Sequence, residues 1–201
     1  MRQTLARRTR EVLMGALFLM VLAAHAAAAD LNWSQTTGLL FYDTAGNWNP
    51  AQTPTATDNV EFSIDVAGNP IIIGASSDAL NVNVLDNDWE FTGAAGGVLT
   101  SAGATTINDA LGTSLVDGTN LDVTNNLTWH NTGNIIVGDT GYGSLTVEDG
   151  SNVDGLQIFV GNTANGVGEL TLTGATTSLT ARLNSNTGVY TIGRGGGTGT
   201  V

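Results

Sequence analysis

An aliphatic-Gly pair followed by the phrase Gly-x-aliphatic-Thr-aliphatic recurs in the last third of this chain. The three pairs are 23 and then 32 residues apart, and the third phrase is incomplete. The pairs are Val137-Gly138, Val160-Gly161 and Ile192-Gly193, and the phrases cover residues 143–147, 168–172 and 199–201. Repeats in this size range indicate an array in which each unit buries its apolar face against the next unit. Equivalent positions of successive copies are therefore expected to lie side by side.

Upstream of these copies, short apolar or alternating runs recur between turn residues from Val60 onward. Alternation with a period of two is typical of strands, and clusters of Gly, Asn, Asp and Thr are typical of turns. No stretch after residue 29 has helical spacing over ten or more residues, so we expect essentially no helix. The expected strands cover residues 60–64, 71–73, 80–84, 89–91, 121–123, 127–129 and 135–137, and the expected turns include 92–97 and 117–120.

We therefore predict an all-β fold, a right-handed parallel β-helix (β-solenoid) over residues 60–201. Coils of about 20 to 30 residues would stack at a strand spacing of about 4.8 Å, with Val, Leu and Ile in inward ladders. Glycines would permit positive φ at the corners. The alternative is a β-sandwich, which also combines short strands with regular turns. It ranks second because a sandwich does not require the same phrase to recur.

Residues 30–59 differ from the repeats in composition, since they hold four large aromatic residues and two of the three prolines of the chain. Proline resists a place in a central strand, whereas aromatic side chains cover a large apolar area. We expect this segment to be an N-terminal cap over the end of the core. Its aromatic residues are Trp33, Phe41, Tyr42 and Trp48, and its prolines are Pro50 and Pro54.

Residues 1–29 have the order of a cleavable secretory signal peptide, with four arginines, an apolar stretch over residues 12–24 and a final series of alanines. The apolar stretch is shorter than the roughly 20 residues that a membrane-spanning helix needs, and His25 interrupts it. We expect cleavage after Ala29, with a retained N-terminal anchor helix as the alternative. Export to the extracellular space or the outer cell surface follows, without membrane insertion of residues 30–201.

Removal of residues 1–29 would leave a strongly acidic chain, with two of the six basic residues and 17 of the 18 acidic residues. The formal charge of residues 30–201 is −15, and their basic residues are Arg182 and Arg194. Such a surface repels phosphate, so we exclude nucleic acid as a partner. Scattered carboxylates are interpreted as a solvated surface. The chain has no cysteine, so we expect a fold without disulfide bonds.

The densest carboxylate cluster comprises Asp86, Asp88 and Glu90, and it is the candidate Ca²⁺ site because hard cations prefer oxygen ligands. It is not an EF-hand loop, since Phe91 stands where that loop needs glycine and Gly97 where it needs a bidentate glutamate. A solvated turn is the alternative interpretation. We expect no other metal and no cofactor.

This chain contains few side chains that suit the catalytic site of a carbohydrate-active enzyme. Glycosidases need two facing carboxylates, and lyases need a cationic base or a metal with a basic partner. Glu148 and Asp149 are adjacent, so on a strand they would point to opposite faces. His130 is the single histidine of residues 30–201, and one imidazole makes no recognisable zinc site. We therefore predict no catalytic residues and no enzymatic activity.

The repeats at residues 137–153, 160–179 and 192–201 resemble those of bacterial autotransporter (type V secretion) passengers and of PEP-CTERM-sorted exported proteins. The upstream Gly46-Asn47-Trp48, Pro54 and residues 58–62 are similar to the opening that often precedes such arrays. The resemblance covers roughly the last third of the chain and implies an exported β-helical passenger or surface protein. The third copy stops at Val201 without the C-terminal sorting segment of these families, which indicates a fragment.

The expected function is a structural or adhesive role at the cell surface, with surface glycans or sister chains as partners. A carbohydrate-active β-helix enzyme fragment is the alternative, and it rests on fold analogy only. Unpaired strand edges at an incomplete coil tend to pair with other chains. We therefore also expect self-association through exposed coil edges.

Overall fold

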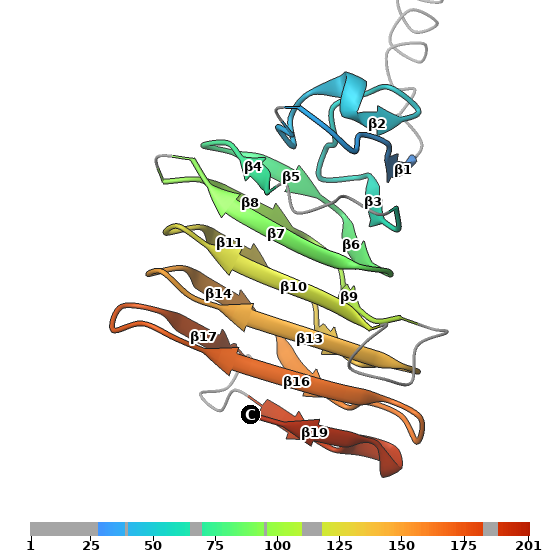
Figure 1. Cartoon of the computed structure of the whole chain (residues 1–201), viewed down its shortest axis with the longest axis vertical. Helices are drawn as coiled ribbons and strands as arrows, with labels where there is room; N and C mark the ends of the chain where they lie inside the picture. The colour runs from blue at the N-terminus through green and yellow to red at the C-terminus, as the bar shows by residue number, and fades with distance from the viewer. Residues whose placement is uncertain (1–27, 39, 65–69, 95, 110–117, 183–188) are drawn as a thin grey trace, which may run out of the picture.

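The computed structural model describes residues 28–38, 40–64, 70–94, 96–109, 118–182 and 189–201, which form an almost entirely β protein with parallel sheets (Figure 1). The all-β prediction is confirmed to that extent. The helical elements of the described residues are two short 3-10 turns, η1 (Ala45–Asn47) and η2 (Arg194–Gly196). The predicted signal peptide at residues 1–29 lies outside the described residues except for its last two positions.

The strands form three sheets, and from β4 onward successive strands belong to sheets B, C and A in turn. Sheet A contains, in spatial order, β18 (Val189–Ile192), β15 (Gln157–Val160), β12 (Ile135–Val137), β9 (Thr105–Ile107), β6 (Asn81–Val84), β3 (Asn59–Phe62), β1 (Asp30–Trp33) and β2 (Trp48–Asn49). Sheet B contains β19 (Thr198–Thr200), β16 (Val167–Leu172), β13 (Tyr142–Val147), β10 (Thr119–Thr124), β7 (Asp88–Gly93) and β4 (Ile71–Ile73). Sheet C contains β17 (Ser178–Ala181), β14 (Asn152–Gly155), β11 (Thr128–Asn131), β8 (Val98–Ser101) and β5 (Ser77–Ala79).

The strand pairing within these sheets is parallel, apart from β1 and β2, which pair antiparallel. Sandwich domains instead pair their strands antiparallel within each sheet. From β3 onward, neighbours in a sheet are three strands apart along the chain, so each of these pairings joins residues that are about one repeat apart. The asparagines Asn59 and Asn81, for example, are 22 residues apart and hydrogen-bonded through their side chains at 2.7 Å.

The register of the sheets places the recurring residues beside one another. In sheet A, Val160 pairs with Val137 on one side and with Ile192 on the other. In sheet B, Gly168 is flanked in the same way by Gly143 and Gly199. The expectation that equivalent positions of successive copies lie side by side is therefore confirmed for the three copies in the last third of the chain.

Glycine is required immediately after each of these sheet A strands. Gly138, Gly161 and Gly193 have φ values of 70°, 71° and 69°, in the left-handed region that other residues rarely adopt. The backbone also passes close by at the first two positions, and a Cβ atom on Gly138 would lie 2.1 Å from the carbonyl oxygen of Val167. The recurrence of glycine after an aliphatic residue thus reflects a turn between a strand of sheet A and the following strand of sheet B.

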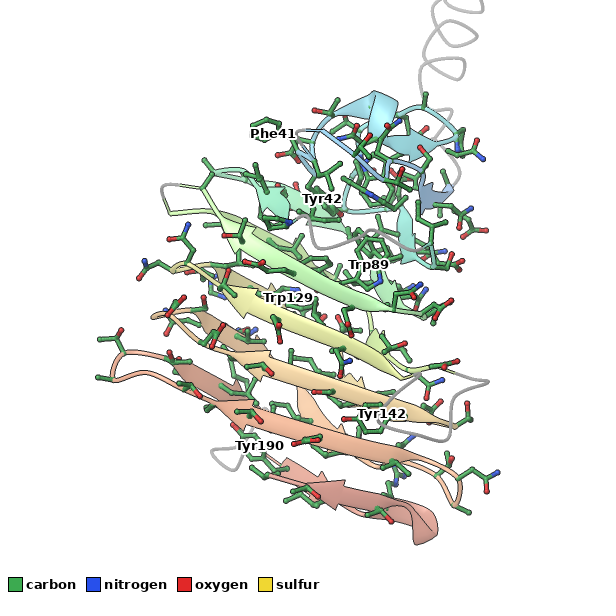
Figure 2. All side chains as sticks on the ribbon, viewed as in Figure 1. Phe41, Tyr42, Trp89, Trp129, Tyr142 and Tyr190 are labelled. Atoms are coloured by element: carbon green, nitrogen blue, oxygen red, sulfur yellow. The ribbon has the colours of Figure 1, made fainter. Side chains whose placement is uncertain are left out.

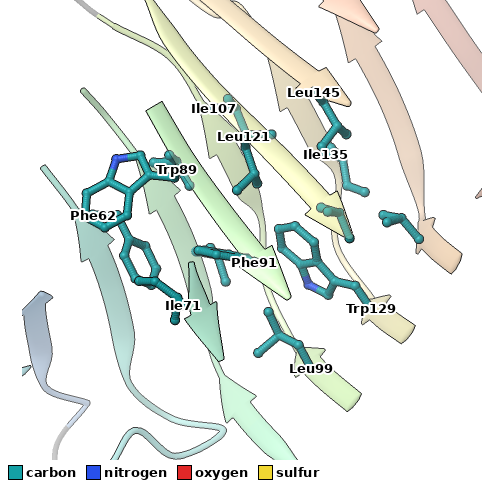
Figure 3. Close-up of a cluster of buried hydrophobic side chains, with 14 of the residues drawn as sticks. Phe62, Ile71, Trp89, Phe91, Leu99, Ile107, Leu121, Trp129, Ile135 and Leu145 are labelled. Atoms are coloured by element: carbon teal, nitrogen blue, oxygen red, sulfur yellow. The ribbon is translucent and has the colours of Figure 1, made fainter. Parts of the chain in front are cut away.

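The inward side chains of the three sheets form one buried cluster that runs along the stack (Figure 3). Phe62 contacts Trp89 with ring centroids 5.1 Å apart, and Phe91 contacts Trp129 at 5.9 Å. Strand alternation supplies these positions, since every second side chain of a strand points to the same face. One inward ladder in sheet B consists of Phe91, Val123 and Val147, all fully buried.

The aromatic N-terminal segment packs onto the first repeat strand of sheet A. Trp33 meets Trp48 edge to face at 5.0 Å, and Trp48 meets Phe62 of β3 at 5.4 Å. The Trp48 Nε1 donates a hydrogen bond to the Tyr42 carbonyl oxygen at 2.7 Å, so the indole is satisfied inside the cluster. Phe41 lies at the outer edge of this segment and is 41% exposed (Figure 2).

Some strands contain residues that the sequence pattern does not predict as strand. Thr92 and Gly93 belong to β7, and Thr119 and Asn120 belong to β10, where turns are expected. Strands β5, β8, β9 and β14, each with at most two large apolar residues, are also absent from the expected set. Each of these strands pairs with one or two parallel neighbours in its sheet. This pairing outweighs the weak preference of their residues for the strand conformation.

Candidate functional site

Outward side chains of sheet B and of the turn after β13 form an acidic face, defined here by Asp88, Glu90 and Asp122 of the sheet and Glu148 of the turn. Asp88 and Glu90 project from one side of β7, and Asp122 of β10 lies opposite Glu90 in register. Partial burial raises the pKa of Asp122, a hydrogen bond from Thr146 opposes this, and the charges of Glu90 and Asp88 raise it further. These carboxylates therefore repel one another, which makes their charged forms less favourable at neutral pH.

The three Ca²⁺ candidates are each engaged by a different neighbour. Asp88 and Glu90 lie on β7, whereas Asp86 precedes the strand. Their partners are the Asn87 backbone N–H for Asp86 (2.8 Å), the Asn120 side-chain amide for Asp88 (2.5 Å) and the Thr124 hydroxyl for Glu90 (2.8 Å). Among the described residues, no group of three or more His, Cys, Asp or Glu side chains is arranged to hold a metal ion. The Ca²⁺ site remains a prediction from sequence.

Glu148 and Asp149 follow the end of β13 and lie in a turn, with Asp149 at a φ of 50°. The opposite-face geometry expected for two strand residues therefore does not apply to them. Partial burial, followed by the charges of Asp149, Asp122 and Glu90, raises the pKa of Glu148. This turn extends the acidic face along sheet B rather than forming a separate site.

Three ionisable side chains meet on the outward face of sheet C, and we call them the His130–Asp154–Arg182 cluster. The His130 Nδ1 lies 2.6 Å from the Asp154 Oδ2, and the Arg182 Nη2 donates to the other oxygen, Oδ1. Arg182 Nη2 also approaches the Asn131 carbonyl oxygen at 3.4 Å. The side chains of His130 and Arg182 are each 48% exposed, whereas that of Asp154 is 19% exposed.

The strand register places these residues together. In β11, Trp129 and Asn131 point inward, so His130 points outward. His130 lies opposite Asp154 in the pairing of β11 with β14, and Asp154 lies opposite Thr180 in the pairing of β14 with β17. Arg182 follows β17 directly, and its backbone N–H donates to the Gly155 carbonyl oxygen. The long side chain of Arg182 then reaches back over β14 to Asp154.

His130 directly follows the strand expected at residues 127–129, lies within β11 in the structure, and has partners that the sequence analysis did not identify. Asp154 lies 24 residues downstream of His130, and Arg182 lies 28 residues downstream of Asp154. Both separations are close to the length of one repeat. Alignment of the repeat that contains His130 with the next two repeats would therefore have indicated that these residues are neighbours. Arg182 falls in the lengthened third copy, where the repeat is least regular.

The charges of the chain are distributed unevenly over its faces. The strands of sheet C contain two acidic residues, Asp78 of β5 and Asp154 of β14, and Arg182 contacts the carboxylate of Asp154. The strands of sheet B contain four, which are Asp88, Glu90, Asp122 and Glu169. The sequence also has no acidic residue after Glu169.

No helix among the described residues has the length and apolar character needed to cross a membrane. Comparison with protein-family models, with curated proteins and with solved structures finds no match.

Proposed function

We propose that this protein is an exported bacterial surface protein with a structural or adhesive role, built as a right-handed β-solenoid and related to autotransporter passengers or PEP-CTERM-sorted proteins. The observation that carries the proposal is the parallel register of equivalent residues along the three sheets, which the described strands keep apart from the antiparallel β1–β2 pair. A stack of this kind grows in one direction and presents long outward faces. Such faces suit contact with extended ligands or with sister chains.

Two further observations support this role. The aromatic segment at residues 30–59 packs on β3 and acts in this proposal as a cap over the first coil, shielding Phe62 and its neighbours. The outward faces carry polar and charged side chains over a continuous apolar core, as expected of a rod that works in water.

Export is tested by expressing the full gene product in a Gram-negative host and analysing cell fractions. We expect the protein outside the cytoplasm with a mature N-terminus at Asp30, identified by mass spectrometry of the terminal peptide. A variant with Leu17→Arg and Leu19→Arg in the apolar stretch is expected to stay in the cytoplasm unprocessed. Cytoplasmic accumulation of the unaltered protein with Met1 retained would contradict the proposal.

Adhesion is tested on the same cells by measuring their attachment to glycan-coated and uncoated surfaces. We expect attachment above that of cells carrying the export-deficient variant. Equal attachment of both strains to every surface would remove the adhesive role and leave a purely structural one.

The His130–Asp154 contact is the one observation that favours a carbohydrate-active enzyme, because a carboxylate-oriented imidazole is a recurring general base. We rank this function second because the cluster lies on an exposed sheet face, with His130 and Arg182 each 48% exposed. Release of new reducing ends from a polysaccharide by the purified protein, and loss of this release in His130→Gln, would establish the enzyme instead.

A further inference from the structure

Two of the three cationic or titratable basic side chains of residues 30–201 converge on one carboxylate. These residues contain two arginines and one histidine, and both Arg182 and His130 contact Asp154. The other arginine, Arg194, instead stacks on the Phe159 ring, with the guanidinium carbon 4.9 Å from the ring centroid. The His130–Asp154–Arg182 cluster therefore concentrates the basic side chains of an otherwise acidic chain at one place.

The contacts within the cluster determine which groups remain for a ligand. A carboxylate only accepts hydrogen bonds, so the proton of the neutral His130 ring lies on Nδ1 and its Nε2 is an acceptor. Arg182 uses Nη2 for both of its contacts, to Asp154 and to the Asn131 carbonyl. Its Nη1 and Nε groups have no protein partner among the described residues. The cluster thus offers an acceptor and a cationic donor side by side.

This combination matches a sugar acid better than it matches a simple anion. The carboxylate of a uronic acid can accept from Arg182, and a ring hydroxyl of the same sugar can donate to the Nε2 of His130. Inorganic sulfate or phosphate could use the arginine, but sulfate has no hydroxyl to donate to the imidazole. A neutral sugar lacks the anionic group.

The surroundings of the cluster fit an extended chain of such sugars. The outward positions next to it are Thr100, Thr128, Ser178 and Thr180, which are polar and uncharged. Successive strands are spaced by about 4.8 Å, so a polymer along the stack meets hydrogen-bonding side chains from β8 to β17, whereas the outward position of β5 beyond Thr100 is the acidic Asp78. The acidic face of sheet B would repel the same polymer, because it carries Asp88, Glu90 and Asp122.

We propose that the outward face of sheet C binds an acidic polysaccharide, with one uronic-acid unit held by Arg182 through its carboxylate and by His130 through a hydroxyl. The proposal deepens the adhesive function and rests on it. Asp154 acts as the positioning residue, since it orients both side chains without touching the sugar.

The test uses the purified protein and trigalacturonate, followed through the His130 ring resonances, which are identified by their loss in His130→Gln. We expect trigalacturonate to shift these resonances and Arg182→Gln to weaken the binding about tenfold, the effect of losing a hydrogen bond to a charged group. Arg194→Gln is the matched control, because it removes the same charge from a site without the imidazole. It should bind like the unaltered protein. The fully methyl-esterified trigalacturonate should bind as weakly as Arg182→Gln binds the acid.

Several results would overturn the site. One is an equal loss of binding in Arg182→Gln and Arg194→Gln, which would mean that only the overall charge matters. Others are equal binding of the acid and the ester, the same shift and affinity with inorganic sulfate, or no shift of the His130 resonances. Cells that still attach to glycan-coated surfaces when they carry Arg182→Gln would overturn this site alone. Failure of export would overturn the proposed function but leave the binding measurement unaffected.

Discussion

Inside the core, the Trp129 indole donates a hydrogen bond from Nε1 to the Ser101 hydroxyl at 2.9 Å, which joins β11 to β8. The Ser101 hydroxyl in turn donates to the Asn131 Oδ1 at 2.8 Å. The Asn131 amide nitrogen completes the chain by donating to the carbonyl oxygens of Gly133 and Asn134. Polar groups of three buried side chains are thus satisfied within one network, and the network fixes where β11 ends and turns.

Replacement of Asn131 by alanine should destabilise the protein strongly. The change removes three hydrogen bonds and leaves the Ser101 hydroxyl without its acceptor in the core, so we expect a loss of about 3 kcal/mol in the free energy of unfolding. The matched control is Asn152→Ala on the exposed face of β14, with an expected loss below about 1 kcal/mol. Urea unfolding measures both, and losses of equal size would show that the buried network contributes nothing special.

Replacement of Gly138 by alanine should destabilise the protein more than the same replacement at a glycine whose only unusual feature is a positive φ. Its Cβ would meet the Val167 carbonyl oxygen at 2.1 Å in addition to the strain of a positive φ, so we expect a loss of about 3 kcal/mol. Gly96→Ala has the positive φ without a clash, with an expected loss of about 1 kcal/mol. Gly46→Ala has neither and should change stability little. Thermal unfolding should rank the variants in this order, and the same melting temperature for all three would refute the explanation.

Replacement of Asp122 and of Asp58 by asparagine should change the free energy of unfolding in opposite directions. The pKa of Asp122 is raised, so its charged form is less favourable in the folded protein, and the penalty disappears as the pH falls below the ordinary value near 3.8. Asp122→Asn should therefore increase stability at pH 7, and the gain should vanish in acid. The free energies of unfolding of the unaltered protein and of Asp122→Asn, measured over a series of pH values, test this prediction.

Asp58 is the opposite case in the chain that retains Ala29, since burial raises its pKa but hydrogen bonds from Thr55, the Ala29 backbone and Gln52 outweigh this and lower it. The stabilisation of the folded protein by charged Asp58 is complete at pH values above the ordinary pKa of an aspartate. It is lost as the pH falls through the lower pKa of Asp58 in the folded protein. Asp58→Asn should cost about 2 kcal/mol at pH 7, because the new amide faces donors. A loss that grows as the pH falls would contradict this assignment.

Strands β17, β18 and β19 should mediate self-association of the purified protein. They are the outermost strands of their sheets, and Tyr190 (Figure 2) and Ile192 of β18 are 46% and 51% exposed, as is Leu172 of the neighbouring β16 at 45%. Ile192→Lys should shift the protein toward monomer in sedimentation velocity experiments. Thr106→Lys, which adds the same charge to the middle of sheet A, should not. A protein that is monomeric at all concentrations would refute the expectation.

The parts of the fold that sequence predicted are those with dense apolar signals. Alternating runs such as Val82 and Val84 of β6 mark inward positions directly, because their neighbours are polar. The aliphatic-Gly pairs were informative for a second reason, since only glycine fits the turn after each sheet A strand. Strands such as β5, with the sequence Ser-Asp-Ala, carry neither signal and are strands because β8 pairs with them.

The candidate site was harder to predict for a geometric reason. His130, Asp154 and Arg182 are spread over three coils, and their meeting depends on the register of two strand pairings and on the reach of one arginine side chain. Local pattern identifies which residues point outward but does not specify which outward residues become neighbours. The acidic face has the same origin, since Glu90 and Asp122 face each other only through the pairing of β7 with β10.

The sheets hold their register although the separation between paired side chains varies from one coil to the next. Asn59 and Asn81 are 22 residues apart, whereas Ser101 and Asn131 are 30 residues apart, and both pairs hydrogen-bond across neighbouring strands. The extra residues lie between β9 and β10 in the sequence, outside the paired strands. Insertions between strands leave the paired positions unchanged, and duplication of three consecutive strands would add one strand to each sheet without changing any existing pairing. A gene for such a protein can diversify its loops and its length as two independent variables.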